Sequence, residues 1–270
     1  MPLRDLLVFL AVVLCLPTAF RRPYFGLLLF SWLAYMRPQD LCWGFARHMR
    51  FSFIVGVTMM VGWYVNESQH RRFRIPEIRT NLMILLAVFI TLSLVFAQRY
   101  SPLTFRYYTE LLKILTIAIF TISQVNTRNR LRGLLWVICA SLAFYSVKNG
   151  LIGLLRGGTT IIRGPGGLLL DNNDFALALI MNIPLLFYLG RTERNALLQK
   201  ACTVAIFLTV VTVLLTHSRS GFLAMTATFL VLAWRSGKLF QAVLMLGVMT
   251  IAFFQFAPDH VLERIASIFT

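Results

Sequence analysis

Long apolar stretches, separated by short basic clusters, make up most of the chain. A transmembrane helix needs about 20 apolar residues, at a rise of about 1.5 Å per residue. On this measure the sequence predicts ten helices, near 4–20, 24–36, 51–66, 80–97, 103–125, 131–155, 173–190, 198–216, 219–234 and 238–256. In a bilayer every backbone N–H and C=O must be satisfied internally, which favours helices throughout. We therefore expect an all-α, polytopic integral membrane protein.

Composition agrees with this pattern. Hydrophobic residues are 58% of the chain and charged residues only 13%, with a mean hydropathy of +0.75. Soluble domains carry about twice that share of charge, so this chain lacks the polar surface of a soluble fold. The net charge of +16 is explained by basic loops next to a membrane. No long basic stretch is interleaved with aromatic residues, so we predict membrane lipids, and no nucleic acid, as partners.

The basic loops also predict an orientation. Lysine and arginine accumulate in cytoplasmic loops. The basic clusters at 21–22, 70–79, 128–132, 191–200 and 235–238 alternate in register, and we assign them to the cytoplasm. The N-terminus and the segments 37–50, 98–102, 156–172, 216–220 and 257–270 then lie on the outer face.

Several arginines nevertheless fall on the predicted outer face. Any one of them has a simple explanation, because arginine at a helix end extends its guanidinium toward the headgroups. As a group they indicate an anionic ligand at this face, and both readings stay open. These residues are Arg37, Arg47, Arg50, Arg99, Arg156, Arg163 and Arg219.

Other titratable residues indicate no second site. Glu110 precedes Lys113 by three residues on one helical face, so we expect the two to form an intramembrane ion pair. The four cysteines form no C-x-x-C pair, and no nucleotide-binding motif is present. The sequence therefore predicts neither a cofactor nor a metal.

The segment 156–174, RGGTTIIRGPGGLLLDNND, is irregular. Its glycines rule out a continuous helix and allow close approach of the backbone to a neighbour. Its exposed amides could hold a phosphate, or the segment could be a simple interhelical loop. The final Asp171-Asn172-Asn173-Asp174 is typical of the N-cap of the following helix. Oxygen ligation of a cation by Asp171 and Asp174 is the alternative.

A second polar cluster lies where one apolar run ends and the next begins. Arg219 lies there among small hydrogen-bonding groups, in the sequence THSRSG at 216–221. This element resembles the T-x-S-R-x-G signature of the O-antigen ligase and polymerase superfamily. The blocks 164–189 (GPGGLLLDNNDFALALIMNIPLLFYL) and 4–46 resemble more specifically the O-glycosylation ligases associated with the exosortase A system.

The resemblance implies a membrane glycosyltransferase with a GT-C-like fold. Such an enzyme moves a glycan from undecaprenyl diphosphate to an acceptor hydroxyl, on protein in this branch, at the periplasmic face of the bacterial inner membrane. It uses no nucleotide sugar, and no metal is required. By its match to the signature, Arg219 would be catalytic and bind the diphosphate. Topology adds Arg163, Arg37, Arg47 and Arg50 as further diphosphate-binding candidates, and the family blocks suggest that Asn172, Asn173, Asp174 and Ser218 shape the site.

The resemblance also predicts two domains. Residues 1–190 correspond to the N-terminal membrane domain of these ligases, and 191–270 to the start of the ligase and polymerase domain. Family members continue into a large outer loop with a further arginine and a histidine. We therefore expect this chain to lack its C-terminal half, including the catalytic base.

Alternative functions remain at this stage. A polymerase of lipid-linked repeat units would share the donor chemistry and differ in its acceptor. A transporter or flippase of an anionic lipid or solute would favour internal repeats and broken helices at mid-membrane. A structural membrane subunit would not need the outer arginines. The sequence has no convincing repeat and gathers its polar groups at one face, which favours the enzyme.

Overall fold

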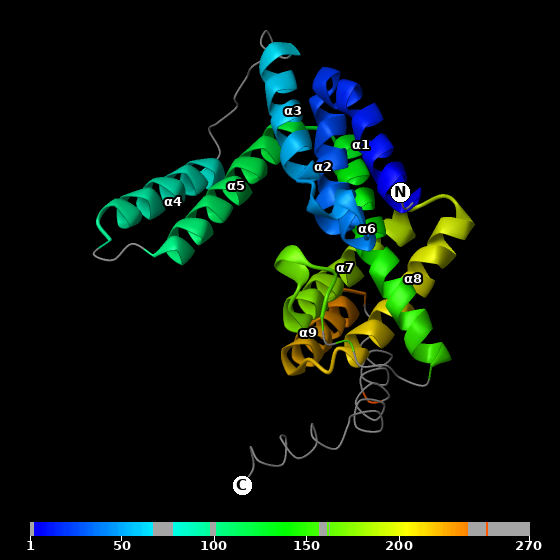
Figure 1. The fold of residues 1–270 in the computed structure, drawn as a ribbon. Coiled ribbons are helices and arrows are strands. Elements are labelled where there is room, and N and C mark those ends of the chain that lie inside the picture. Colours follow the sequence, from blue (N-terminus) through cyan, green and yellow to red (C-terminus); the bar gives the residue numbers. More distant parts are fainter. Residues whose placement is uncertain are drawn as a thin grey trace. The chain divides into compact units, whose positions relative to one another are not determined.

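A computed structural model describes residues 3–66, 78–97, 101–156, 161, 163–236 and 247. The described part is helical and contains no strand (Figure 1). The α-helices are α1 (Leu3–Arg21), α2 (Pro23–Tyr35), α3 (Phe51–Asn66), α4 (Ile78–Val95), α5 (Pro102–Gln124), α6 (Arg128–Leu155), α7 (Asn172–Thr192), α8 (Ala196–Leu215) and α9 (Arg219–Ser236). The described residues also form short 3₁₀ helices at η1 (Pro38–Leu41), η2 (Phe45–His48) and η4 (Gly167–Leu169).

Nine of the ten predicted segments are helices with closely similar bounds, which confirms the all-α prediction for this part of the chain. The tenth, 238–256, lies outside the described residues except for residue 247, and 98–100 and 257–270 lie outside them entirely. Within the described residues, four helices are long and apolar enough to cross a membrane: α1, α6, α7 and α8. Three shorter apolar helices cover Pro23–Tyr35, Phe51–Asn66 and Thr80–Val95.

One side-chain prediction within the helices is wrong. In α5, Glu110 pairs with Arg106, at 3.4 Å from Oε1 to the arginine Nε, rather than with Lys113. Both spacings place the two side chains on one helical face, so the pattern alone did not distinguish them. The longer guanidinium arm of Arg106, one turn before Glu110, reaches the carboxylate.

The chain divides into two compact units, and α1, α2 and α6 contribute residues to both. The first comprises Met1–Asp5, Trp32–His48 and Leu135–Thr270, and the second comprises Leu6–Ser31 and Met49–Leu134. We describe each by itself.

In the second unit, small residues allow helices to approach closely. A Cβ added at Gly62 of α3 would overlap the carbonyl oxygen of Phe20 in α1. The Asn66 amide nitrogen donates to that same oxygen at 2.7 Å and to the Gly62 carbonyl at 2.9 Å. Gly26 of α2 likewise faces Met59 of α3, where a Cβ added to the glycine would lie 2.6 Å from the Met59 Cβ. Such small-residue contacts are typical of helix pairs in membranes, where apolar burial gives helices no advantage over lipid.

In the first unit, α6, α7 and α8 are joined by polar contacts inside an apolar core. The Asn182 amide of α7 donates to the Cys139 carbonyl of α6 at 3.2 Å. The Thr212 hydroxyl of α8 donates to the Ser146 carbonyl of α6 at 2.9 Å. Helix α7 also contains Pro184, which lacks an N–H and so removes one hydrogen bond from the middle of the helix.

Candidate functional site

Helix α7 begins where the sequence predicts its cap. Asp171 has extended backbone angles (φ −69°, ψ 142°), and its carboxylate accepts from the Asn173 N–H at 2.8 Å. This satisfies one of the N–H groups that a helix start leaves without a partner. The N-cap prediction for this cluster is therefore confirmed. Asp174, in the first turn, is exposed.

The junction between α8 and α9 is a tight turn followed by a second capped helix. His217 has a positive φ of 48°, which reverses the chain direction after α8. Ser218 is only 3% exposed. Its hydroxyl accepts a hydrogen bond from the Gly221 N–H at 3.0 Å and so caps α9, which begins at Arg219. A Cβ on Gly221 would come within 3.0 Å of the Ala176 Cβ, so this glycine allows α9 to lie against α7.

Two hydrogen bonds join the starts of these two helices. The Ser218 hydroxyl donates to the Asn173 side-chain oxygen at 2.6 Å, and the Asn172 amide donates to the Thr216 carbonyl at 3.2 Å. The N-termini of α7 and α9 therefore lie side by side. Each presents N–H groups and a partial positive charge, the arrangement that binds anions at helix starts.

Replacement of Ser218 by alanine tests this junction. Loss of the cap and of the bond to Asn173 is expected to lower the free energy of unfolding by about 1–2 kcal/mol. Thermal unfolding in detergent provides the measurement. Ser218→Thr, which keeps the hydroxyl, should lose less than half as much. Ser220→Ala is the control, since Ser220 is exposed and its hydroxyl contacts only that of Ser218, at 3.1 Å. Equal losses for Ser218→Ala and Ser220→Ala would contradict this account.

The arginines named from the sequence differ in their surroundings. Arg219 is exposed at the first position of α9, and no described residue forms an ion pair with its guanidinium. Arg163 is also exposed, and its backbone forms an isolated antiparallel bridge with Asp171, which places it next to the α7 cap. Arg47 is exposed on η2. Arg50 is exposed and belongs to the second unit.

Arg37 has a different environment. Its Nε lies 2.5 Å from the Asp40 carboxylate, with a left-handed backbone at Arg37 (φ 46°, ψ 56°) before η1. The ion pair packs on the glycine-rich segment: a Cβ at Gly167 would overlap the Arg37 guanidinium, and one at Gly166 would lie 2.6 Å from the Asp40 carboxylate. Both glycines have positive φ, 124° at Gly166 and 58° at Gly167. The charge of Arg37 is therefore already compensated by Asp40. The sequence analysis does not predict this ion pair, although Asp40 follows Arg37 by only three residues.

Three of the predicted outer segments meet in the first unit. The loop around Arg37 lies on Gly166 and Gly167, the Ile161 N–H donates to the Leu215 carbonyl at 2.9 Å, and Asn172 reaches Thr216. These contacts gather the three segments at one end of α7, α8 and α9.

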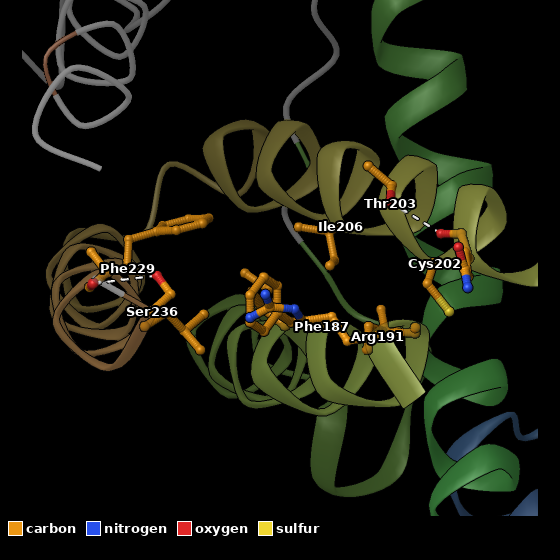
Figure 2. A pocket seen from close by; sticks show the side chains of 13 residues that line it. Phe187, Arg191, Cys202, Thr203, Ile206, Phe229 and Ser236 are labelled. Atoms are coloured by element: carbon orange, nitrogen blue, oxygen red, sulfur yellow. Dashed lines mark hydrogen bonds between the residues drawn. The ribbon is translucent and has the colours of Figure 1, made fainter. Parts of the chain in front are cut away.

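A cavity of about 570 Å³ lies toward the other end of the same three helices. Figure 2 shows Phe187, Ile206 and Phe229 around it, from α7, α8 and α9, with Arg191 at the end of α7. The Arg191 guanidinium lies over the Phe187 ring, 5.2 Å from its centroid. None of the arginines or amides predicted to bind or shape a diphosphate site lines this cavity.

Side chains that can bind metal are scattered in the part of the chain that the structure describes. No group of three or more His, Cys, Asp or Glu side chains among the described residues could hold an ion. Cys42, in the loop between η1 and η2, is 1% exposed. Burial raises the pKa of its thiol above the usual value, and the nearby Asp5 carboxylate raises it further. A thiol of raised pKa is a poor nucleophile near neutral pH.

These features define a class: a protein that is all-helical in its described part, whose long apolar helices indicate a membrane protein, with two exposed arginines beside the hydrogen-bonded starts of α7 and α9. Residues 3–194 match the model of a family described as a family of unknown function (DUF5935), and the chain belongs to this family. No curated protein and no solved structure matches the chain.

Proposed function

We propose that the protein is a membrane glycosyltransferase that transfers a glycan from undecaprenyl diphosphate to an acceptor hydroxyl. One observation carries the proposal: the N-termini of α7 and α9 lie side by side, with exposed Arg219 on one and Arg163 beside the cap of the other. A lipid diphosphate is an anion of matching charge, and a membrane enzyme meets it at a helix end. The resemblance to exosortase-associated O-glycosylation ligases supports the same donor.

The formal charges at this end balance. Arg163 and Arg219 contribute two positive charges, and Asp171 and exposed Asp174 contribute two negative charges. The Asp171 carboxylate caps α7 and offsets the partial positive charge of that helix start, so Arg219 and the start of α9 are the part of this end that favours an anion. An arginine fork matches two phosphate oxygens at once, so Arg219 is the group best suited to a diphosphate.

In the proposed reaction the acceptor oxygen attacks the anomeric carbon of the donor glycan. The bond from that carbon to the diphosphate oxygen breaks, and the electron pair leaves with undecaprenyl diphosphate. Arg219 stabilises the negative charge that develops on the leaving oxygen, which is electrostatic catalysis by a group already in place. The acceptor proton passes to a general base, for which we assign no residue.

The finer topology belongs to this proposal. We propose ten spans in a GT-C-like arrangement, in the bacterial inner membrane, with the Arg219 end at the periplasmic face. The acceptor is a hydroxyl of an exported protein, or of a glycan if the enzyme acts as a polymerase. The family boundary at residue 194 lies close to the domain boundary expected at 190, and the division itself remains a prediction.

Donor binding tests the proposal directly. The purified chain in lipid nanodiscs is expected to bind undecaprenyl diphosphate at least about tenfold more tightly than uncharged undecaprenol, a difference of about 1.4 kcal/mol. Undecaprenyl monophosphate should fall between the two. Equal affinity for the diphosphate and the alcohol would contradict a site built for a lipid diphosphate.

A further inference from the structure

Trp43 is one of the highly exposed aromatic side chains among the described residues. It is 76% exposed, in the short connection between η1 and η2. Tryptophan is highly buried on average, because its ring contributes a large apolar area. A single exposed tryptophan on a loose loop would need no explanation. Whether Trp43 is held at the surface therefore depends on how firmly the connection between η1 and η2 is fixed.

The connection is held firmly by a buried carboxylate. Asp5, in the first turn of α1, is 0% exposed, and its Oδ1 accepts from the N–H groups of both Gly44 and Ala46, each at 3.0 Å. Ala46 is itself 0% exposed. A Cβ added at Gly44 would lie only 3.0 Å from the same carboxylate oxygen. Gly44, which directly follows Trp43, and Ala46 are therefore fixed, and Trp43 is held outward by the fold.

The surroundings of Trp43 are cationic and apolar. The Arg4 guanidinium lies 5.0 Å from the centroid of the indole ring. The segment 42–50, CWGFARHMR, has two further arginines and no acidic residue. From Arg4 onward α1 continues as an apolar helix with exposed leucines, among them Leu7 (61%) and Leu14 (72%). A tryptophan beside a cation thus lies at the end of a helix whose exposed face suits hydrocarbon.

We propose that Trp43 and Arg4 form a docking surface for the headgroup layer of an anionic phospholipid bilayer. The indole ring lies at the boundary between hydrocarbon and headgroups, where tryptophan is enriched because one part of it is apolar and its N–H is polar. The Arg4 guanidinium contacts lipid phosphate while it remains over the ring. Asp5 fixes the depth of this surface through Gly44 and Ala46. The inference does not depend on glycan transfer.

The depth of Trp43 can be measured with the full chain in vesicles that contain phospholipids brominated at defined positions. The Trp43 signal is the difference in fluorescence between the wild type and Trp43→Phe. We expect bromines near the headgroup end of the acyl chain to quench this signal at least about twofold more than bromines near its middle, because the aromatic belt lies at the interface. Aqueous iodide should quench it weakly. Strong iodide quenching without bromolipid quenching would overturn the proposal, because Trp43 would then face water and suit a soluble ligand.

The anionic preference has its own test with the same signal. Quenching of Trp43 by brominated phosphatidylglycerol is compared with quenching by brominated phosphatidylcholine. Arg4→Gln is expected to lower the preference for phosphatidylglycerol about fivefold, since one arginine near a charged surface contributes on that order. Arg194→Gln is the matched control, an exposed arginine in the connection between α7 and α8. An unchanged preference in Arg4→Gln, or an equal loss in Arg194→Gln, would overturn the role of Arg4.

Discussion

Arg219→Ala, made in a version of the protein that includes the expected C-terminal half, is expected to lower the rate of glycan transfer by about 100-fold or more, with insertion into the membrane unchanged. The loss of one fixed donor or cation that faces developing charge has effects of this order in other enzymes. Arg219 is exposed at the start of α9, so its removal leaves no buried group without a partner and costs little stability. Transfer is measured with lipid-linked glycan and acceptor in membranes that contain equal amounts of each variant.

Two further variants make this result specific. Arg219→Lys keeps the charge but loses the two-pronged geometry, and should retain a small part of the activity. Arg235→Ala removes an exposed arginine from the last turn of the same helix, and should transfer at the wild-type rate. Wild-type transfer by Arg219→Ala would refute the diphosphate assignment even if the donor binds.

Gly62→Ala is expected to lower the free energy of unfolding by about 1–3 kcal/mol, the typical range for overpacking. The added Cβ would overlap the Phe20 carbonyl oxygen and lie 2.8 Å from the Phe20 carbonyl carbon and Cα. These are backbone atoms, so the clash is relieved only if α3 moves away from α1. That movement would also break the hydrogen bond from Asn66 to Phe20.

Gly56→Ala, six residues earlier in α3, is the matched control. Its Cβ would meet the Phe30 ring at 3.5 Å, an ordinary van der Waals contact. Because alanine favours helix over glycine by about 1 kcal/mol, this variant should be neutral or slightly more stable. Unfolding of both variants in mixed detergent micelles gives the comparison. Equal stability of the two variants would mean that α1 and α3 do not approach closely at Gly62.

The helices and caps were predictable because their causes are local. Apolar stretches long enough to form a helix define α1 to α9. Asp171 caps α7 by accepting from the N–H of Asn173, two residues further along the chain. The alternation of loops also placed Asn173 and Arg219 at the same end. The direct bond from Ser218 to Asn173 was not predictable, because it depends on how closely α9 approaches α7 at Gly221 and Ala176.

Charge compensation was the main feature that the sequence pattern left out. Arg37 was grouped with the other outer arginines, yet a left-handed turn at its own backbone brings Asp40 to its guanidinium. Glu110 similarly has two possible partners at helical spacing, Arg106 and Lys113, and in the structure it forms the ion pair with Arg106. Arg163 and Arg219 remain the members of the predicted set with exposed side chains next to the two capped helix starts. Side-chain pairing over three or four residues depends on geometry that residue order alone does not specify.

Pro184 gives α7 a mechanical property. It lies between the capped end at Asn172 and Asn173 and the cavity end at Arg191, and its missing N–H leaves the helix weakest there. Bending at Pro184 therefore costs least, and any such bend tilts one end of α7 with respect to the other.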